Sequence, residues 1–87
     1  MTTPKPEATG RGYASGFVAQ VEASDQALPG VQLGLLCIKY NIPIAWVAAQ
    51  MGVSRQTIYN WFSGTVPQGH RQAKVEKLLT HLRNRLS

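Results

Sequence analysis

Residues 44–63, IAWVAAQMGVSRQTIYNWFS, contain two short amphipathic stretches on either side of a tight corner at residues 51–54. Gly52 can adopt the positive φ that ends one helix, and Ser54 can cap the next by accepting a hydrogen bond from a free backbone N–H. A small residue, Ala48, stands where two crossed helices would approach most closely. Apolar side chains recur where such helices bury their contact, at Val47, Met51, Val53, Ile58 and Trp61. The stretch therefore predicts two helices packed across a tight turn.

The second of these helices would carry hydrogen-bonding side chains on its outer side. In a helix-turn-helix that docks in the major groove, such side chains reach base edges, where Arg pairs with guanine and Gln or Asn with adenine. We expect the bases to be read by Arg55, Gln56, Tyr59 and Asn60. Polar residues of the same helix, the next loop and the start of the last helix would bind phosphates and set the register. These are Ser54, Thr57, Ser63, Thr65, Gln68, Arg71 and Lys74.

The net charge of +5 is unevenly distributed along the chain. Residues 1–43 are balanced, with three basic and three acidic side chains, whereas residues 44–87 hold six basic side chains against Glu76 alone. A polyanionic partner explains this excess, because basic side chains that neutralise phosphates release counterions. A solvated surface explains the charge equally well by itself, and the neighbouring motif favours double-stranded DNA.

Composition excludes several other classes of protein. The 87 residues suit one small domain, and 44% apolar residues is ordinary for a globular chain. A single cysteine, Cys37, permits no internal disulfide, and no apolar run is long enough to span a bilayer. The N-terminus does not resemble a secretory signal, so we expect a cytoplasmic protein. His70 and His81 have no zinc-site spacing, and the carboxylates have no ordered catalytic partner; we expect no metal, cofactor, small-molecule ligand or enzymatic activity.

Punctuating residues divide the chain into further elements. Residues 1–16 are rich in Thr, Pro, Gly and Ala and are expected to form a disordered tail, with the domain proper at 17–87. Such a tail can carry basic residues into a minor groove, although it holds only Lys5 and Arg11. A short helix is expected within 17–28. The next helix should begin at Pro29 and end at Asn41, and Pro43 should open the one after it.

Gly64 should end the helix that begins near Ser54, and a loop at 65–69 should follow it. The last segment, His70 to Leu86, shows an apolar stripe with basic residues around it. The stripe can pack on the domain, and its end can also form a two-fold dimer interface through Leu82 and Leu86. Strand-like alternation is absent from the sequence, so the expected fold is an all-α bundle of four to five helices.

The stretch from Val31 to Leu82 resembles the helix-turn-helix domain of the lambda-repressor/Cro-type family. The resemblance rests on the pattern Ala48, Gly52, Val53, Ser54, Ile58 and Trp61, with Leu33-Gly34-Leu35-Leu36 before it and Gly64, Pro67 and an apolar helix after it. It implies a lambda-repressor-like bundle that binds operator DNA as a homodimer on a pseudo-palindromic site. It also implies a phage or prophage regulator, commonly a repressor, acting at the nucleoid of a bacterial or phage-infected cell.

Three positions depart from the family pattern. Ile44 replaces a polar residue, often Gln, that braces a phosphate at the start of the first motif helix. Cys37 stands where Arg is common, and Phe62 stands where Glu is common. Both partners of the usual Arg–Glu pair are therefore absent, so we expect apolar packing in its place.

Two other functions fit the same fold. A helix-turn-helix can bind a host or phage protein, with Trp46 and Phe62 as anchors. It can also serve as an accessory factor in DNA packaging or recombination that needs a partner enzyme to have any effect.

Overall fold

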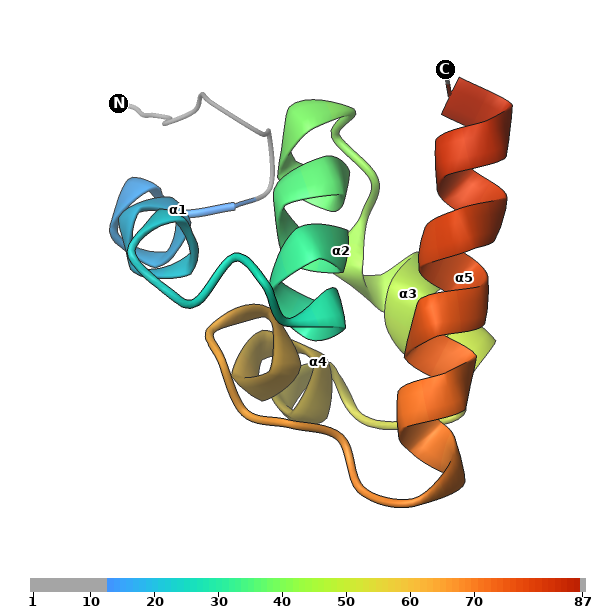
Figure 1. Ribbon diagram of the computed structural model, residues 1–87. Coiled ribbons are helices and arrows are strands. Elements are labelled where there is room, and N and C mark those ends of the chain that lie inside the picture. The colour runs from blue at the N-terminus through green and yellow to red at the C-terminus, as the bar shows by residue number, and fades with distance from the viewer. Residues whose placement is uncertain (1–12, 87) are drawn as a thin grey trace.

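The computed structural model describes residues 13–86, which form five helices and no strand (Figure 1). In chain order the helices are α1 (Ser15–Glu22), α2 (Pro29–Lys39), α3 (Ile44–Met51), α4 (Arg55–Phe62) and α5 (His70–Leu86). The predicted all-α bundle of four to five helices is therefore confirmed. α2 lies at the centre of the bundle, with α1 on one side, α5 on the other and α4 across one end (Figure 1).

The chain changes direction where the sequence predicts it. Pro29 begins α2, where its fixed φ suits the first turn and its missing N–H is not needed. Asn41 adopts a left-handed φ of 56° after α2, and Gly64 adopts a positive φ of 118° after α4. Pro43 precedes the first residue of α3 in an extended conformation. These turns redirect the chain so that α2 packs mainly against α4 and α5, whereas α3 packs against α4 and α1 against α2.

The core is apolar throughout, and no polar or charged side chain of residues 13–86 is buried. Its largest fully buried members come from all five helices, among them Val21 of α1, Leu33 of α2, Val47 of α3, Phe62 of α4 and Val75 of α5. The stripe of α5 packs against α2, and Arg83 Nη2 donates a 2.8 Å hydrogen bond to Gln32 Oε1 between the same two helices. One side of every helix therefore contributes to a single core.

Two glycines in α2 allow α4 to approach closely. A Cβ on Gly30 would lie 2.8 Å from the carbonyl oxygen of Trp61, and a Cβ on Gly34 would lie 2.8 Å from Phe62 Cγ. Side chains do not tolerate contacts of this length, so only glycine fits at either position without a shift. Gly30 and Gly34 thus set the distance between α2 and α4.

The expected boundary between tail and domain is wrong for residues 13–16. Tyr13 is only 5% exposed, and α1 already begins at Ser15 and ends at Glu22, earlier than the expected helix within 17–28. Two aromatic side chains, at 13 and 17, stabilise this start because their rings stack with centroids 6.2 Å apart. Residues 1–12, with Lys5 and Arg11, lie outside the described part of the chain.

A membrane-spanning segment is not found among the described residues, because none of the five helices is both long and apolar enough. The sixteen-residue core and its partly buried neighbours belong to one cluster. The helices that carry the predicted DNA-contacting residues therefore sit on a common hydrophobic support.

Candidate nucleic-acid interface

The corner between α3 and α4 follows the local rules that the sequence predicts. Gly52 has a left-handed φ of 69° at the end of α3, and because a Cβ there would meet no atom within 4 Å, the backbone conformation rather than space favours glycine. Ser54 caps α4, since its Oγ accepts a 3.2 Å hydrogen bond from the backbone N–H of Thr57. Ala48 of α3 is 6% exposed, and α3 packs against α4. α3, the turn and α4 thus form a helix-turn-helix.

One face of α4 is buried. Ile58 and Phe62 are fully buried and Trp61 is 5% exposed, so three side chains fix this helix to α2 and α3. Burying one side chain of this size stabilises the folded protein by about 1.5–3 kcal/mol relative to leaving that side chain exposed. These buried side chains therefore hold α4 against α2 and α3, at the distance that the glycines of α2 allow.

The opposite face of α4 is exposed and polar. Arg55, Gln56 and Asn60 are exposed, and Gln56 Nε2 donates a 3.0 Å hydrogen bond to Asn60 Oδ1. This bond leaves Gln56 Oε1 as an acceptor and the Asn60 amide nitrogen with donors. Adenine offers one acceptor and one donor at its major-groove edge, so the joined pair presents the complementary groups. The pair also loses less side-chain freedom on binding because it is already ordered.

Tyr59 lies at the edge of this exposed face rather than at its centre. Its ring is half-buried and packs edge-to-face against Phe17 of α1, with centroids 4.8 Å apart and an interplanar angle of 88°. Aromatic pairs prefer this geometry. The contact covers one side of the ring, so less of Tyr59 is exposed than the sequence predicts. Base reading by Tyr59 stays a prediction.

The three hydroxyl groups predicted to bind phosphates on α4 already have partners within the protein. Ser54 Oγ and Thr57 Oγ1 lie 3.0 Å apart at the start of the helix. Ser63 Oγ donates a 2.8 Å hydrogen bond to the carbonyl of Tyr59. Each hydroxyl oxygen can still accept a hydrogen bond, but its single hydrogen can already be used within the protein. These hydroxyls are built into the ends of the helix, and their contacts with phosphate stay predictions.

The remaining phosphate-binding candidates lie after α4. Thr65 and Gln68 are exposed in the loop, and Arg71 and Lys74 are exposed in the first turns of α5. All four of these polar side chains are thus exposed on the part of the chain that follows α4, and their contacts with phosphate stay predictions. Ile44, at the start of α3, is half-buried and packs against the core, so no polar side chain stands there.

α1 and its flanks hold the helix-turn-helix at three points. The Tyr13 hydroxyl donates a 2.7 Å hydrogen bond to the carbonyl of Ile42, just before α3. Phe17 contacts Tyr59 in the middle of α4, and Ser24 Oγ lies 3.0 Å from the carbonyl of Ser63 at its end. We call residues 13–24 the α1 brace. This role was not predicted from the sequence, although the spacing of the aromatic residues Tyr13 and Phe17, four positions apart, is typical of side chains on one side of a helix.

Burial acts on two ionisable groups near this brace. Desolvation raises the pKa of the Tyr13 hydroxyl, which is nearly covered, and electrostatic repulsion from the ionised forms of Cys37 and Tyr59 adds to the shift. Burial also raises the pKa of the Cys37 thiol to about 12, so its reactive thiolate is scarce at neutral pH. Cys37 and Phe62 are both fully buried, in agreement with the expected apolar packing.

The two leucines predicted at a dimer interface differ in exposure. Leu82 is 7% exposed and belongs to the core of the protomer, whereas Leu86 is half-buried at the end of α5. Leu82 thus leaves little surface for a partner. Phe62 cannot anchor a partner protein, because it is fully buried, whereas Trp46 is 40% exposed on the outer side of α3.

The described residues contain no group of three or more potential metal ligands. The models of known protein families, the curated proteins and the solved structures with which the chain was compared include no match to it.

Proposed function

We propose that this protein binds double-stranded DNA sequence-specifically and regulates transcription as a small repressor of the lambda-repressor/Cro type that its sequence resembles. α4 would enter the major groove. Arg55, Gln56 and Asn60 would read base edges, and the exposed residues of the loop and early α5 would contact phosphates.

The observation that carries this proposal is the division of α4 into two faces. Its apolar face is buried against α2 and α3, and its opposite face holds an ordered Gln56–Asn60 pair beside Arg55. An exposed helix with amide and guanidinium groups can read bases, and the basic excess of residues 44–87 favours a phosphate backbone beside it. Burial of one face and ordering of the other both reduce the entropy lost on docking.

We further propose that the protein binds DNA as a homodimer. Tyr40 and Trp46 are each 40% exposed, and Tyr40 and half-buried Leu86 line one hollow beside the end of α5. These apolar surfaces are the ones that a second copy can bury, and Leu82, which lines a hollow beside Trp46 but is only 7% exposed, would contribute little. A two-fold pair would place two recognition helices roughly 34 Å apart, which is one turn of DNA.

Selection of DNA from a random duplex pool by the purified protein tests both proposals. We expect enrichment of one sequence, arranged as two half-sites with their centres about 10 base pairs apart. We also expect affinity to fall with salt by about 0.9 in log–log slope for each phosphate neutralised. Failure to enrich any sequence would refute specific binding. Enrichment of an unrepeated site, with a one-to-one complex in sedimentation, would refute only the dimer.

A further inference from the structure

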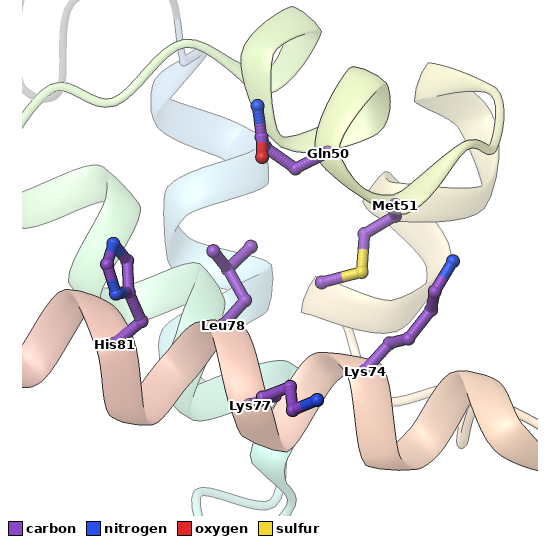
Figure 2. A pocket seen from close by; sticks show the side chains of 6 residues that line it. All are labelled: Gln50, Met51, Lys74, Lys77, Leu78 and His81. Carbon is purple, nitrogen blue, oxygen red and sulfur yellow. The ribbon is translucent and has the colours of Figure 1, made fainter.

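A groove between α3 and α5 lies apart from the polar face of α4 (Figure 2). Its volume is about 320 Å³, and none of the α4 residues lines it. The side chains of Met51 on α3 and Leu78 on α5 point toward each other across this space (Figure 2). Met51 is 5% exposed and forms the floor, whereas Leu78 is half-buried and forms one wall. The groove thus offers an apolar place for one inserted side chain.

Basic and polar side chains surround this apolar centre. Lys74, Lys77 and His81 stand along α5, and Gln50 stands on α3 at the opposite side (Figure 2). Lys74, Lys77 and His81 are exposed, so their nitrogen atoms can meet a partner in solution. The groove is therefore apolar inside and positive along one edge.

Nothing among the described residues neutralises this edge at close range. α3 has no charged residue, and the carboxylates of the described residues are Glu22, Asp25 and Glu76. Glu22 and Asp25 lie at and just after the end of α1, and none of the three lines the groove. Glu76 lies on α5, where successive residues are turned by about 100°. Lys77, Leu78 and His81 share one side of this helix, and Glu76 faces nearly the opposite side. The positive charge of the groove is thus available to a partner.

We propose that the groove between α3 and α5 binds an acidic segment of another protein that inserts one apolar side chain. The apolar side chain would lie between Met51 and Leu78. Carboxylates before and after it in the segment would pair with Lys74, Lys77 and the imidazole of His81. The proposal does not depend on DNA binding. Lys74 is also a candidate phosphate contact, so on a DNA-bound protein Lys77 and His81 would remain to pair with the segment and recruit the partner to that site.

The chemistry of the groove favours a protein segment over nucleic acid. A phosphate backbone needs donors and charge but has no side chain to place between Met51 and Leu78. An acidic peptide with an apolar anchor uses both parts of the groove, as segments that bind hydrophobic grooves with charged rims do. Charge complementarity would also increase the rate of encounter and exclude basic partners.

A random library of displayed peptides, selected on the whole protein, tests the proposal. We expect enriched peptides to place Asp or Glu on both sides of one Leu, Phe or Trp. Lys77→Glu should weaken binding of a synthetic enriched peptide by about tenfold or more, because it replaces attraction by repulsion. Lys39→Glu is the matched control, since it makes the same change of charge at another exposed lysine, on α2. We expect it to change binding less than about twofold because exposed charges at a distance are screened.

Lys77→Glu should melt at the temperature of the wild type, because Lys77 is exposed. Lys39→Glu loses the 5.4 Å contact of the Lys39 ammonium with the Tyr40 ring at the end of α2 and should melt slightly lower, so peptide binding is measured well below the melting temperature of both variants. Amide shifts in NMR spectra locate the bound peptide, and they should concentrate at Met51, Lys77, Leu78 and His81. The proposal is overturned if no peptide is enriched, if enriched peptides lack an acidic excess, or if Lys77→Glu binds them as well as the wild type. It is also overturned if Lys77→Glu instead weakens duplex DNA binding and leaves peptide binding intact. None of these results bears on whether α4 reads DNA.

Discussion

The two faces of α4 are made by neighbouring residues, but packing in the core constrains one face and not the other. Trp61 and Phe62 lie in the core, whereas Asn60, the residue before them, is exposed and bonded to Gln56. Packing fixes the identity of the buried side chains, because the core has no room for a change of volume. Solvent surrounds the exposed side chains, so their identity is constrained by what they bind rather than by packing. Changes to the buried face should therefore act on folding, and changes to the exposed face on binding alone.

The largest effect should come from Trp61, the bulkiest side chain on the buried face. Trp61→Ala should lower the free energy of unfolding by about 3–5 kcal/mol, since it leaves a cavity between α4 and its neighbours. Trp46→Ala is the matched control, because Trp46 is 40% exposed, and we expect it to cost less than about 1 kcal/mol. Urea unfolding followed by circular dichroism measures both. Equal losses in the two variants would contradict the division into two faces.

Gly34 tests the same face from the side of α2. Gly34→Ala would place a Cβ 2.8 Å from the buried ring of Phe62, and we expect it to cost about 1–3 kcal/mol because the ring has no space to move away. Gly16→Ala in α1 meets no atom within 4 Å. That control should instead gain about 0.5–1 kcal/mol, as Ala favours a helix over Gly. If thermal unfolding shows the same sign for both, the close packing of α2 on α4 is not as described.

Phe17 contacts Tyr59 at the border between the two faces of α4, so a change there should affect both stability and binding. Phe17→Ala should cost about 1–2 kcal/mol, through the lost edge-to-face pair with Tyr59 and the lost burial. It should also reduce affinity for a selected duplex, because the middle of α4 loses a support from the α1 brace. Phe17→Leu keeps much of the apolar volume and should restore most of the stability. A duplex affinity unchanged in Phe17→Ala would limit the brace to a role in folding.

Tyr13 should show the smallest effect on stability. Tyr13→Phe removes the 2.7 Å hydrogen bond to Ile42 and keeps the ring, so we expect a loss of about 1 kcal/mol at neutral pH. Burial raises the pKa of Tyr13 above its unfolded value, so the hydroxyl stabilises the fold fully below about pH 10 and progressively less above it. Unfolding curves at increasing pH should fall less steeply for Tyr13→Phe than for the wild type. Parallel curves would mean that Tyr13 ionises as freely in the folded protein as in the unfolded one.

Local signals made most of the fold predictable. Gly52, Ser54, Pro29 and Asn41 act through their own backbone or through a partner a few residues away, so their effects can be read from short stretches of sequence. The helical stripe of α5 is equally local, and His70 to Leu86 was predicted as its extent. These rules hold because dihedral preferences and end caps do not depend on distant contacts.

The parts that were missed depend on contacts between distant residues. Tyr13 bonds to Ile42 and Phe17 meets Tyr59, and nothing in residues 1–16 alone distinguishes such anchors from a polar tail. The depth of Leu82 in the core also depends on how α5 packs against the rest of the bundle. Sequence could therefore identify which residues of α4 face outward, but not that α1 covers one edge of them.

Base reading by the exposed face of α4 is tested most directly with Gln56→Ala. Its affinity should be measured for the selected duplex and for a set of duplexes with single base-pair changes. We predict a loss of about 1–3 kcal/mol on the selected duplex and loss of preference at one base pair, with unfolding unchanged within about 0.5 kcal/mol. An equal loss on every duplex would place Gln56 on the DNA backbone and contradict the claim that this face reads bases.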